Sequence, residues 1–196
     1  MVRSLFISAI VLILCACQEE KGAQPEVERA LPVKVCDQQA QPGQSVYTEF
    51  FREHLVRPEA SGFAKVETLQ EPQKYYLFYL TASYCTPCHA FSPTLVSFYE
   101  MYQEIYGDQF EFILVSADRD EQSMLAYSLE KRMKWPHIEA GALALFREEF
   151  QLPGRLIPNV VVTDRDGNVL KSSYDRDGVY HGPEIPMNHL KNLLAQ

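Results

Sequence analysis

The sequence predicts an α/β fold with a central mixed sheet flanked by helices, in which a parallel core is extended by an antiparallel C-terminal hairpin. One observation is that apolar, strand-like runs alternate with amphipathic, helix-like stretches between residues 74 and 133. Another is a pair of strand-like runs around Asp166-Gly167, a dipeptide typical of hairpin turns. Strand, helix, strand, helix in succession favours parallel strands with right-handed crossovers, and the hairpin adds antiparallel strands.

The first element of the 196-residue chain has the features of an export signal. Residues 1–16 hold one basic residue, Arg3, and an apolar run from Leu5 to Leu14, after which the sequence becomes polar. A transmembrane helix needs about 20 apolar residues, so this run is short for a membrane span. We therefore predict a signal peptide at 1–16.

The end of that segment, Leu14-Cys15-Ala16-Cys17, resembles the lipobox of bacterial lipoproteins. The resemblance implies cleavage after Ala16 and lipidation of Cys17. It also implies a lipid-anchored, extracytoplasmic protein on the periplasmic side of a bacterial membrane. Gln18 after the anchor favours the outer membrane within that family. Ordinary secretion, with Cys17 unmodified, is the alternative.

Residues 17–45 predict a flexible tether, because they are rich in Gln, Glu, Pro and Gly and lack a periodic apolar pattern. Cys36 lies in this stretch. Its simplest interpretation is a thiol without function, and a disulfide with another molecule is the alternative. The net charge of −8 argues against a nucleic-acid partner.

The folded domain is expected at 46–196, beginning with a helical extension at 46–70. Its first helix, which should end near Arg57-Pro58, has apolar residues at helical spacing: Val46, Phe50, Phe51, Leu55 and Val56. The following elements are expected as a buried strand at 74–82, a helix ending at Gly107, a strand at 109–118, a helix at 121–133, the hairpin, and a last helix near 187–194.

The junction between the first strand and its helix carries the motif Cys85-Thr86-Pro87-Cys88-His89. Two cysteines at this spacing fit a redox dithiol, and with the histidine they also fit the attachment loop of a c-type haem. A cysteine at a helix N-terminus faces unpaired N–H groups and the positive end of the helix dipole, which stabilise a thiolate. In such motifs the thiol pKa falls from about 8.5 to roughly 3.5–7.5. We therefore expect Cys85 to be the exposed nucleophile and Cys88 the more buried resolving thiol.

Further motifs make the chain resemble the thioredoxin superfamily, in particular its tryparedoxin and nucleoredoxin branch and bacterial TlpA-like proteins. They are the strand that runs into the cysteines, a helix proline at Pro93, and Ile157-Pro158 before a β-branched strand. The resemblance implies a thioredoxin-like fold and a protein thiol-disulfide oxidoreductase. Its partners would be protein disulfides or dithiols and a membrane electron donor or acceptor, and the Cys85–Cys88 pair would need no cofactor.

The same resemblance assigns residues around the cysteines. Pro158 would be a cis-proline beside the active site, with the Ile157 backbone available to a substrate strand. The remaining residues of the rim would be Tyr84, Thr86, Pro87 and Trp135, although for Trp135 ordinary core packing is an equal alternative. His89 is expected at the surface or rim, where it either tunes the thiols electrostatically or is simply solvated.

Three positions depart from the family pattern. Tyr84 stands where the family has Trp, and Tyr79 stands where ordinary thioredoxins have a buried Asp that transfers protons. The proton acceptor for Cys88 is therefore unassigned. Asn159 follows Pro158 where Thr is common, which affects the expected substrate preference and not the chemistry.

Other functions fit less of the sequence. A c-type haem protein could use Met101, Met124, Met133 or His137 as the distal ligand. A peroxiredoxin-type peroxidase would need Pro and Thr or Ser where Phe78 and Ala82 stand. A binding module could keep the cysteines as a structural disulfide. We expect no metal, because the histidines lack ligand spacing, and the Asp-Arg-Asp strings at 118, 164 and 175 fit turns and strand ends.

Overall fold

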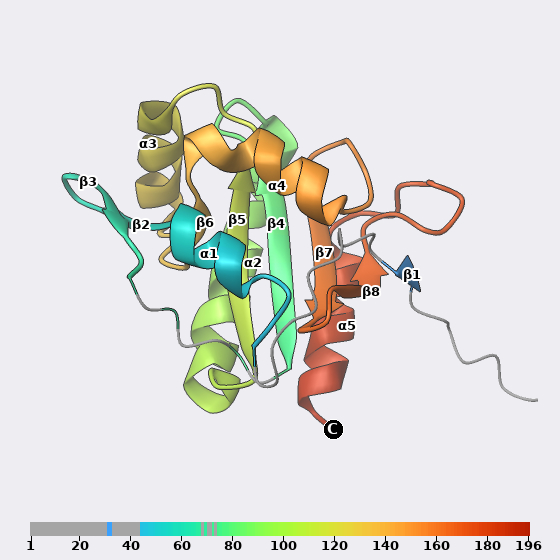
Figure 1. Cartoon of the computed structure of the whole chain (residues 1–196). Helices are drawn as coiled ribbons and strands as arrows, with labels where there is room; N and C mark the ends of the chain where they lie inside the picture. Colours follow the sequence, from blue (N-terminus) through green and yellow to red (C-terminus); the bar gives the residue numbers. More distant parts are fainter. Residues whose placement is uncertain (1–30, 33–43, 68, 70–71, 73) are drawn as a thin grey trace, which may run out of the picture.

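A computed structural model describes residues 31–32, 44–67, 69, 72 and 74–196 (Figure 1). The predicted signal peptide, the lipidation site Cys17 and most of the predicted tether, including Cys36, lie outside these residues. Within the described part of the chain, eight strands form one sheet in the order β1-β8-β7-β4-β5-β6-β2-β3.

The centre of the sheet has the mixed topology that the sequence predicts. Strand β4 (Tyr75–Thr81) pairs in parallel with β5 (Phe110–Ser116) and antiparallel with β7 (Asn159–Asp164). The hairpin partner of β7 is β8 (Asn168–Ser172), and Gly167 in the turn has a positive φ of 82°. Six of the seven residues of β4 are buried, because helices cover both faces of the sheet. The predicted fold class is confirmed.

Helices cover each face of the sheet with a separate apolar core. Helices α2 (Thr86–Tyr106), α3 (Glu121–Lys131) and α5 (Glu184–Leu194) contribute to the first core. Helix α1 (Thr48–His54), the short η1 (Ala140–Ala142) and α4 (Leu143–Phe150) contribute to the second, and α1 and α4 lie on the near face in Figure 1. Alternate residues of β4 serve the two cores, with Leu77 and Tyr79 on one face and Tyr76 and Phe78 on the other.

The N-terminal extension is not helical throughout, which corrects the prediction for 46–70. Helix α1 ends at His54, and the chain continues into a hairpin of β2 (Leu55–Glu59) and β3 (Gly62–Lys65). Leu55 and Val56 pair with the short strand β6 (His137–Ile138). Their apolar side chains fit a helical period and a buried strand equally well, so periodicity alone could not separate the two.

Two boundaries of the domain also differ from the prediction. Leu31 and Pro32, which we expected in the tether, form β1 and pair with β8 at one edge of the sheet. Ser45 is buried, and its hydroxyl lies 3.2 Å from that of Tyr76.

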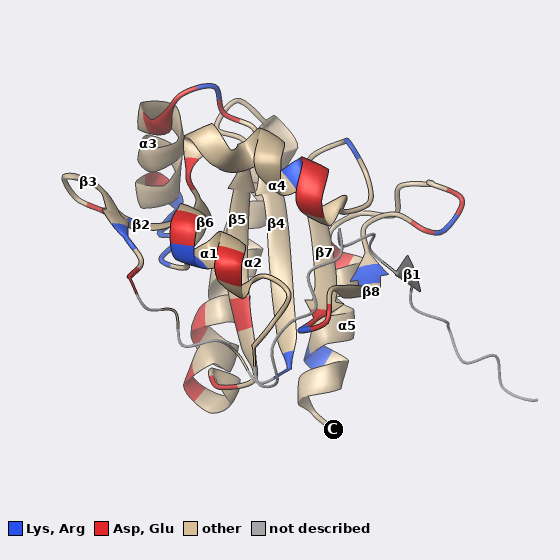
Figure 2. Cartoon of the chain, viewed as in Figure 1, with Lys and Arg blue, Asp and Glu red and all other residues tan. Residues whose placement is uncertain are grey.

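The surface carries mixed charge, with acidic residues on α1, α2, α3 and α4 in the view of Figure 2. Among the described residues, every helix is too short or too polar to pass through a lipid bilayer.

Candidate active site

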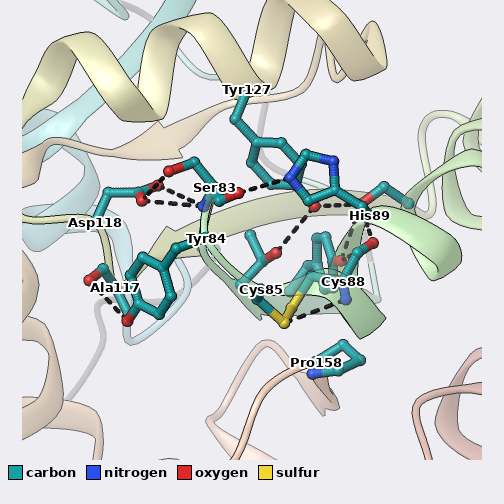
Figure 3. Close-up of a disulfide and its surroundings, with 12 residues drawn as sticks. Ser83, Tyr84, Cys85, Cys88, His89, Ala117, Asp118, Tyr127 and Pro158 are labelled. Atoms are coloured by element: carbon teal, nitrogen blue, oxygen red, sulfur yellow. Dashed lines mark hydrogen bonds between the residues drawn. A yellow bond between two sulfur atoms is a disulfide. The ribbon is translucent and has the colours of Figure 1, made fainter.

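A disulfide joins Cys85 and Cys88 at the start of α2, just beyond the carboxyl end of β4 (Figure 3). Cys85 is the N-cap residue of the helix, and its Sγ accepts a hydrogen bond from the backbone N–H of Cys88 at 3.2 Å. The Cys85 side chain thus takes the place that a Ser or Asp oxygen usually occupies at a helix N-terminus. In the reduced protein, the same N–H would stabilise a thiolate on Cys85.

The local sequence favours a helix start at this point. Thr86 and Pro87 are the first two helical residues, and a proline here removes an N–H that would lack a partner in the helix anyway. The first turn of α2 contains no acidic residue. No carboxylate of that turn therefore offsets the positive end of the helix dipole next to the sulfur.

The two cysteines differ in exposure in the expected order. Cys88 is fully buried, whereas Cys85 is 7% exposed. Cys85 is nevertheless much less open than we expected of an exposed nucleophile. The next two residues of the chain, Thr86 and Pro87, are both at the surface.

A buried carboxylate fixes the turn that presents Cys85. Asp118 follows β5 and accepts hydrogen bonds from the Ser83 N–H at 3.0 Å and from the Ser83 hydroxyl at 2.6 Å. It also accepts one from the hydroxyl of Ser116 at 2.7 Å. The Cys85 N–H in turn donates to the carbonyl of Ala82 at 3.1 Å. The turn between β4 and α2 is therefore fastened to the neighbouring strand.

His89 connects this turn to the first turn of α2. Its Nε2 lies 2.6 Å from the carbonyl oxygen of Ser83, and since a carbonyl only accepts, Nε2 carries the proton. Nδ1 lies 3.8 Å from the carboxylate of Glu130, and the ring packs against that of Tyr127 with centroids 4.7 Å apart. His89 is half-buried, so the expected place at the rim is correct, and its ring is hydrogen-bonded rather than simply solvated.

A group of hydroxyls lies beneath Cys88. Ser92 Oγ donates to the carbonyl of Cys88 at 2.9 Å and lies 3.0 Å from the Tyr79 hydroxyl and 2.7 Å from the Tyr127 hydroxyl. Burial raises the pKa of Tyr79 far above its usual value, so this residue stays protonated at neutral pH. Tyr79 thus replaces the family's buried Asp by a hydrogen-bonding group and not by another proton acceptor.

The second wall of the site is the segment that precedes β7. The Ile157-Pro158 peptide bond is cis, as the resemblance implies, and Pro158 is buried. Figure 3 shows the Pro158 ring beside the disulfide. Ile157 is half-buried, and Asn159 is fully buried. The chain thus brings together residues 85–88 and 157–158, which are about seventy positions apart.

The other predicted rim residues divide into two groups. Tyr84 is 69% exposed and lies next to the cysteines, as expected of a rim residue. Trp135 has no exposed surface and packs its ring against Tyr99 and Phe112, at centroid distances of 5.1 and 5.3 Å. The prediction of Trp135 at the rim is therefore wrong. Burial of this large ring in the first core outweighs any place in a surface loop.

Sequence reasoning missed the role of Asp118, although a signal was present. In neighbouring parallel strands the carboxyl ends lie at the same edge, so a residue just after β5 must lie near the turn after β4. The interpretation of the Asp-Arg-Asp strings as turn chemistry is confirmed elsewhere. Asp164 accepts two backbone N–H groups in the hairpin turn, and so does Asp175 in the turn that follows it. The described residues contain no cluster of potential metal ligands.

A cysteine pair at the start of the helix that follows a central parallel strand, facing a cis-proline, defines the class of thioredoxin-fold domains. Residues 73–169 match the family model described as Thioredoxin-like.

Known proteins resemble the same part of the chain. It is 33% identical over 99 residues to nucleoredoxin from Xenopus laevis, a match that covers 49% of this chain and 23% of the relative. It is 32% identical over 143 residues to a probable nucleoredoxin 1 from Arabidopsis thaliana, a match that covers 68% of this chain and 23% of the relative. The solved structure of tryparedoxin I from Leishmania major aligns with a TM-score of 0.50 and 26% identity, covering 66% of this chain and 87% of that one. The chain thus spans about a quarter of the length of these nucleoredoxins.

Proposed function

We propose that this protein is a thiol-disulfide oxidoreductase that exchanges electrons with protein disulfides through Cys85 and Cys88. The observation that carries the proposal is the position of the Cys85 sulfur, which caps α2 and accepts the N–H of Cys88. An anion at this position is stabilised before any substrate arrives. The similarity to nucleoredoxins and a tryparedoxin supports the same chemistry.

The reaction follows from the order in which the two sulfurs are reached. In the reduced protein, the Cys85 thiolate attacks one sulfur of a substrate disulfide, forms a mixed disulfide and releases the other substrate sulfur as a thiolate. Cys88, once deprotonated, then attacks the Cys85 sulfur. This second step forms the Cys85–Cys88 disulfide and releases the remaining substrate thiolate. The substrate gains two electrons and the protein loses two, and the reverse sequence oxidises a substrate dithiol.

We also propose that the protein works outside the cytoplasm, held at a bacterial membrane by lipid on Cys17. The support is the sequence alone: Arg3, the apolar run and the lipobox-like end of the segment. In that location the regenerating partner would be an electron donor or acceptor in the membrane. Under this proposal the redox-active cysteine pair is sufficient without a bound cofactor.

Trapping of mixed disulfides tests the chemistry. In a Cys88→Ser variant the first attack proceeds and the second is blocked, so we expect stable, reductant-sensitive adducts with a disulfide-containing protein such as insulin. The matched Cys85→Ser variant should form none, because Cys88 is fully buried. A protein whose disulfide is only structural would give no adduct with either variant.

The localisation is tested separately by metabolic labelling with a radioactive fatty acid in a bacterial host. Label should enter the full chain and be lost in a Cys17→Ser variant, while Cys15→Ser should still incorporate it. Equal labelling of the wild type and the Cys17→Ser variant would contradict lipidation at this residue.

The c-type haem protein is the remaining alternative with a specific motif. His89 would have to serve as the proximal ligand, yet its Nε2 donates to the carbonyl of Ser83 at 2.6 Å. The short bond holds the ring against the turn, so the geometry favours the dithiol function. Expression with haem-attachment machinery, followed by measurement of a Soret band, tests this alternative.

A further inference from the structure

The loop that carries the cis-proline is held from outside by two tyrosines of the segment that follows β8. The Tyr174 hydroxyl accepts a hydrogen bond from the backbone N–H of Leu156 at 2.7 Å. The Tyr180 hydroxyl donates to the carbonyl oxygen of Pro158 at 2.8 Å. The two hydroxyls therefore bind the backbone on the two sides of Ile157.

The segment that provides these tyrosines, residues 173–182, is itself well fastened. Asp175 accepts the N–H groups of Asp177 and Val179 through Oδ1, and its Oδ2 lies 2.7 Å from Nε2 of His181. The N–H of His181 donates to the carbonyl of Ser173 at 2.7 Å. The rings of Tyr174 and Tyr180 pack against each other with centroids 5.2 Å apart. We call this unit the tyrosine segment.

The base of the cis-proline loop is closed as well. The side-chain amide of Asn159 donates to the carbonyl of Pro153 at 2.8 Å. Gly154 lies directly beneath the Tyr174 ring, where an added Cβ would be 2.1 Å from a ring carbon. The aromatic ring therefore rests on bare backbone.

These contacts leave the two backbone polar groups of one residue, Ile157, open. Within the described part of the chain, the backbone N–H and C=O of Ile157 take part in no hydrogen bond, whereas the Leu156 N–H and the Pro158 carbonyl are both occupied by tyrosine hydroxyls. Ile157 precedes the proline that lies beside the disulfide in Figure 3. The open groups of Ile157 are those that an extended peptide could pair with while its own disulfide lies at Cys85.

We propose that Tyr174 and Tyr180 are positioning residues for protein substrates: their hydroxyls hold the Ile157 backbone in place for an extended segment of the substrate. This inference rests on the proposed function and adds a determinant of substrate affinity to it. The tyrosines touch neither sulfur, so they should act on the binding of peptide-like disulfides and not on the thiol chemistry.

The experiment compares two disulfides of different size. Insulin carries its disulfides in polypeptide chains, whose backbone groups can pair with that of Ile157, whereas 5,5′-dithiobis(2-nitrobenzoate) is too small to do so. The variants Tyr174→Phe and Tyr180→Phe keep the rings and remove the hydroxyls. Since one hydrogen bond is lost in each variant, we expect KM for insulin to rise roughly five-fold, with kcat unchanged. The rate constant of the reduced variants with the small disulfide should equal that of the wild type.

Tyr106→Phe is the matched control, because it removes a tyrosine hydroxyl near the far end of α2. It should leave both reactions and the melting temperature unchanged. Unchanged KM for insulin in both tyrosine-segment variants would overturn the inference while the wild type still reduces insulin. An equal loss with insulin and with the small disulfide would also overturn it, because it would indicate general damage to the site. A wild type that reacts with neither disulfide would instead overturn the proposed function.

Discussion

The two faces of the sheet bury different kinds of side chain. The core beneath α1 and α4 is a largely aromatic cluster, in which Phe146 packs against Phe50, Phe78 and Phe150 at centroid distances of 5.1–5.6 Å. The core beneath α2, α3 and α5 is also apolar, but it contains the Cys85–Cys88 disulfide and buried hydroxyls such as that of Tyr79.

The difference indicates a division of labour between the two faces. On one side the sheet is stabilised mainly by aromatic packing, and the buried hydroxyls of Tyr47 and Tyr76 there bond to Thr163 and Ser45, away from the cysteines. On the other side, each buried polar group needs a partner, and those partners fix the backbone around the cysteines. Substitutions should therefore separate stability from disulfide exchange according to the face they touch.

The largest expected effect on chemistry is that of Cys85→Ser. Removal of the attacking sulfur should abolish disulfide exchange, because a serine hydroxyl cannot form the mixed disulfide. Measured with reductant present, so that no protein contains the disulfide, the free energy of unfolding should change by less than about 1 kcal/mol. Residual turnover of insulin by this variant would contradict the assignment of Cys85 as nucleophile.

Phe146→Ala should have the opposite effect. The side chain is 1% exposed, and truncation of a buried phenylalanine costs about 3–5 kcal/mol of unfolding free energy. The exchange rate constant per folded molecule should stay within a factor of two of the wild type. Urea denaturation together with a single-turnover assay gives both quantities. A large loss of exchange in the folded variant would show that the two faces are not independent.

The pH dependence of stability tests a third buried residue, His137, which packs near α3. Its Nδ1 donates to the carbonyl of Trp135 at 2.7 Å, and its Nε2 lies 2.7 Å from the hydroxyl oxygen of Ser128. Burial lowers the pKa of His137 from 6.5 to about 4. Because the folded protein binds this proton less readily than the unfolded chain, the stabilisation is present above pH 6.5 and is lost as the pH falls toward 4.

The lowered pKa of His137 corresponds to a loss of about 3 kcal/mol of unfolding free energy as the pH falls from above 6.5 to 4. Urea denaturation at pH 7 and pH 4 should show this loss in the wild type and a smaller one in His137→Gln. Burial raises the pKa of Glu111, so this carboxyl contributes the opposite slope, losing stabilisation as the pH rises. The difference between the two proteins removes that contribution. Equal slopes would contradict a neutral, buried His137.

Asp118→Asn should have the smallest effect of the four. The asparagine side chain keeps one acceptor oxygen, but its NH2 group replaces the other oxygen and faces hydrogen-bond donors. At a buried site this loss costs about 1–3 kcal/mol of unfolding free energy. We expect a few-fold slower exchange, since the turn before Cys85 loses its fastening. Asp120→Asn is the control. Asp120 is the N-cap residue of α3, and asparagine caps a helix as well as aspartate does. Equal results for the two variants would remove Asp118 from the site.

The parts of the fold with strong local patterns could be predicted from the sequence. The order of β4, α2, β5 and α3, the hairpin at Gly167 and the last helix all follow from apolar periodicity and turn residues. Helix α4 was missed, although Phe146 and Phe150 lie four residues apart, because the helix has only eight residues. The two-residue strand β6 has no pattern of its own and forms because its neighbours in the sheet offer backbone partners.

The site was predictable where the residues themselves carry the chemistry. Cys85, Cys88 and Pro158 have unusual backbone or reactive properties, so their place in the chain was informative. Tyr174, Tyr180 and Asp118 have side chains that occur anywhere on a protein surface. Their roles depend on which backbone groups tertiary packing brings within 3 Å, and no local spacing encodes that. The prediction of Trp135 at the rim was wrong for the same reason, because the local sequence around a tryptophan is the same whether its ring is buried in the core or exposed in a loop.

Gly154, whose backbone lies against the Tyr174 ring, limits how this protein can be engineered to accept other substrates. With a φ of +92° and an aromatic ring in the place of a side chain, position 154 accepts no other residue without displacing Tyr174. When the protein is evolved in the laboratory for new substrates, substitutions of Leu156 should cost little stability, because its side chain is 62% exposed. Substitutions of Gly154 should be strongly destabilising unless Tyr174 is changed at the same time. Libraries that randomise the two positions together should recover folded clones that single-site libraries miss.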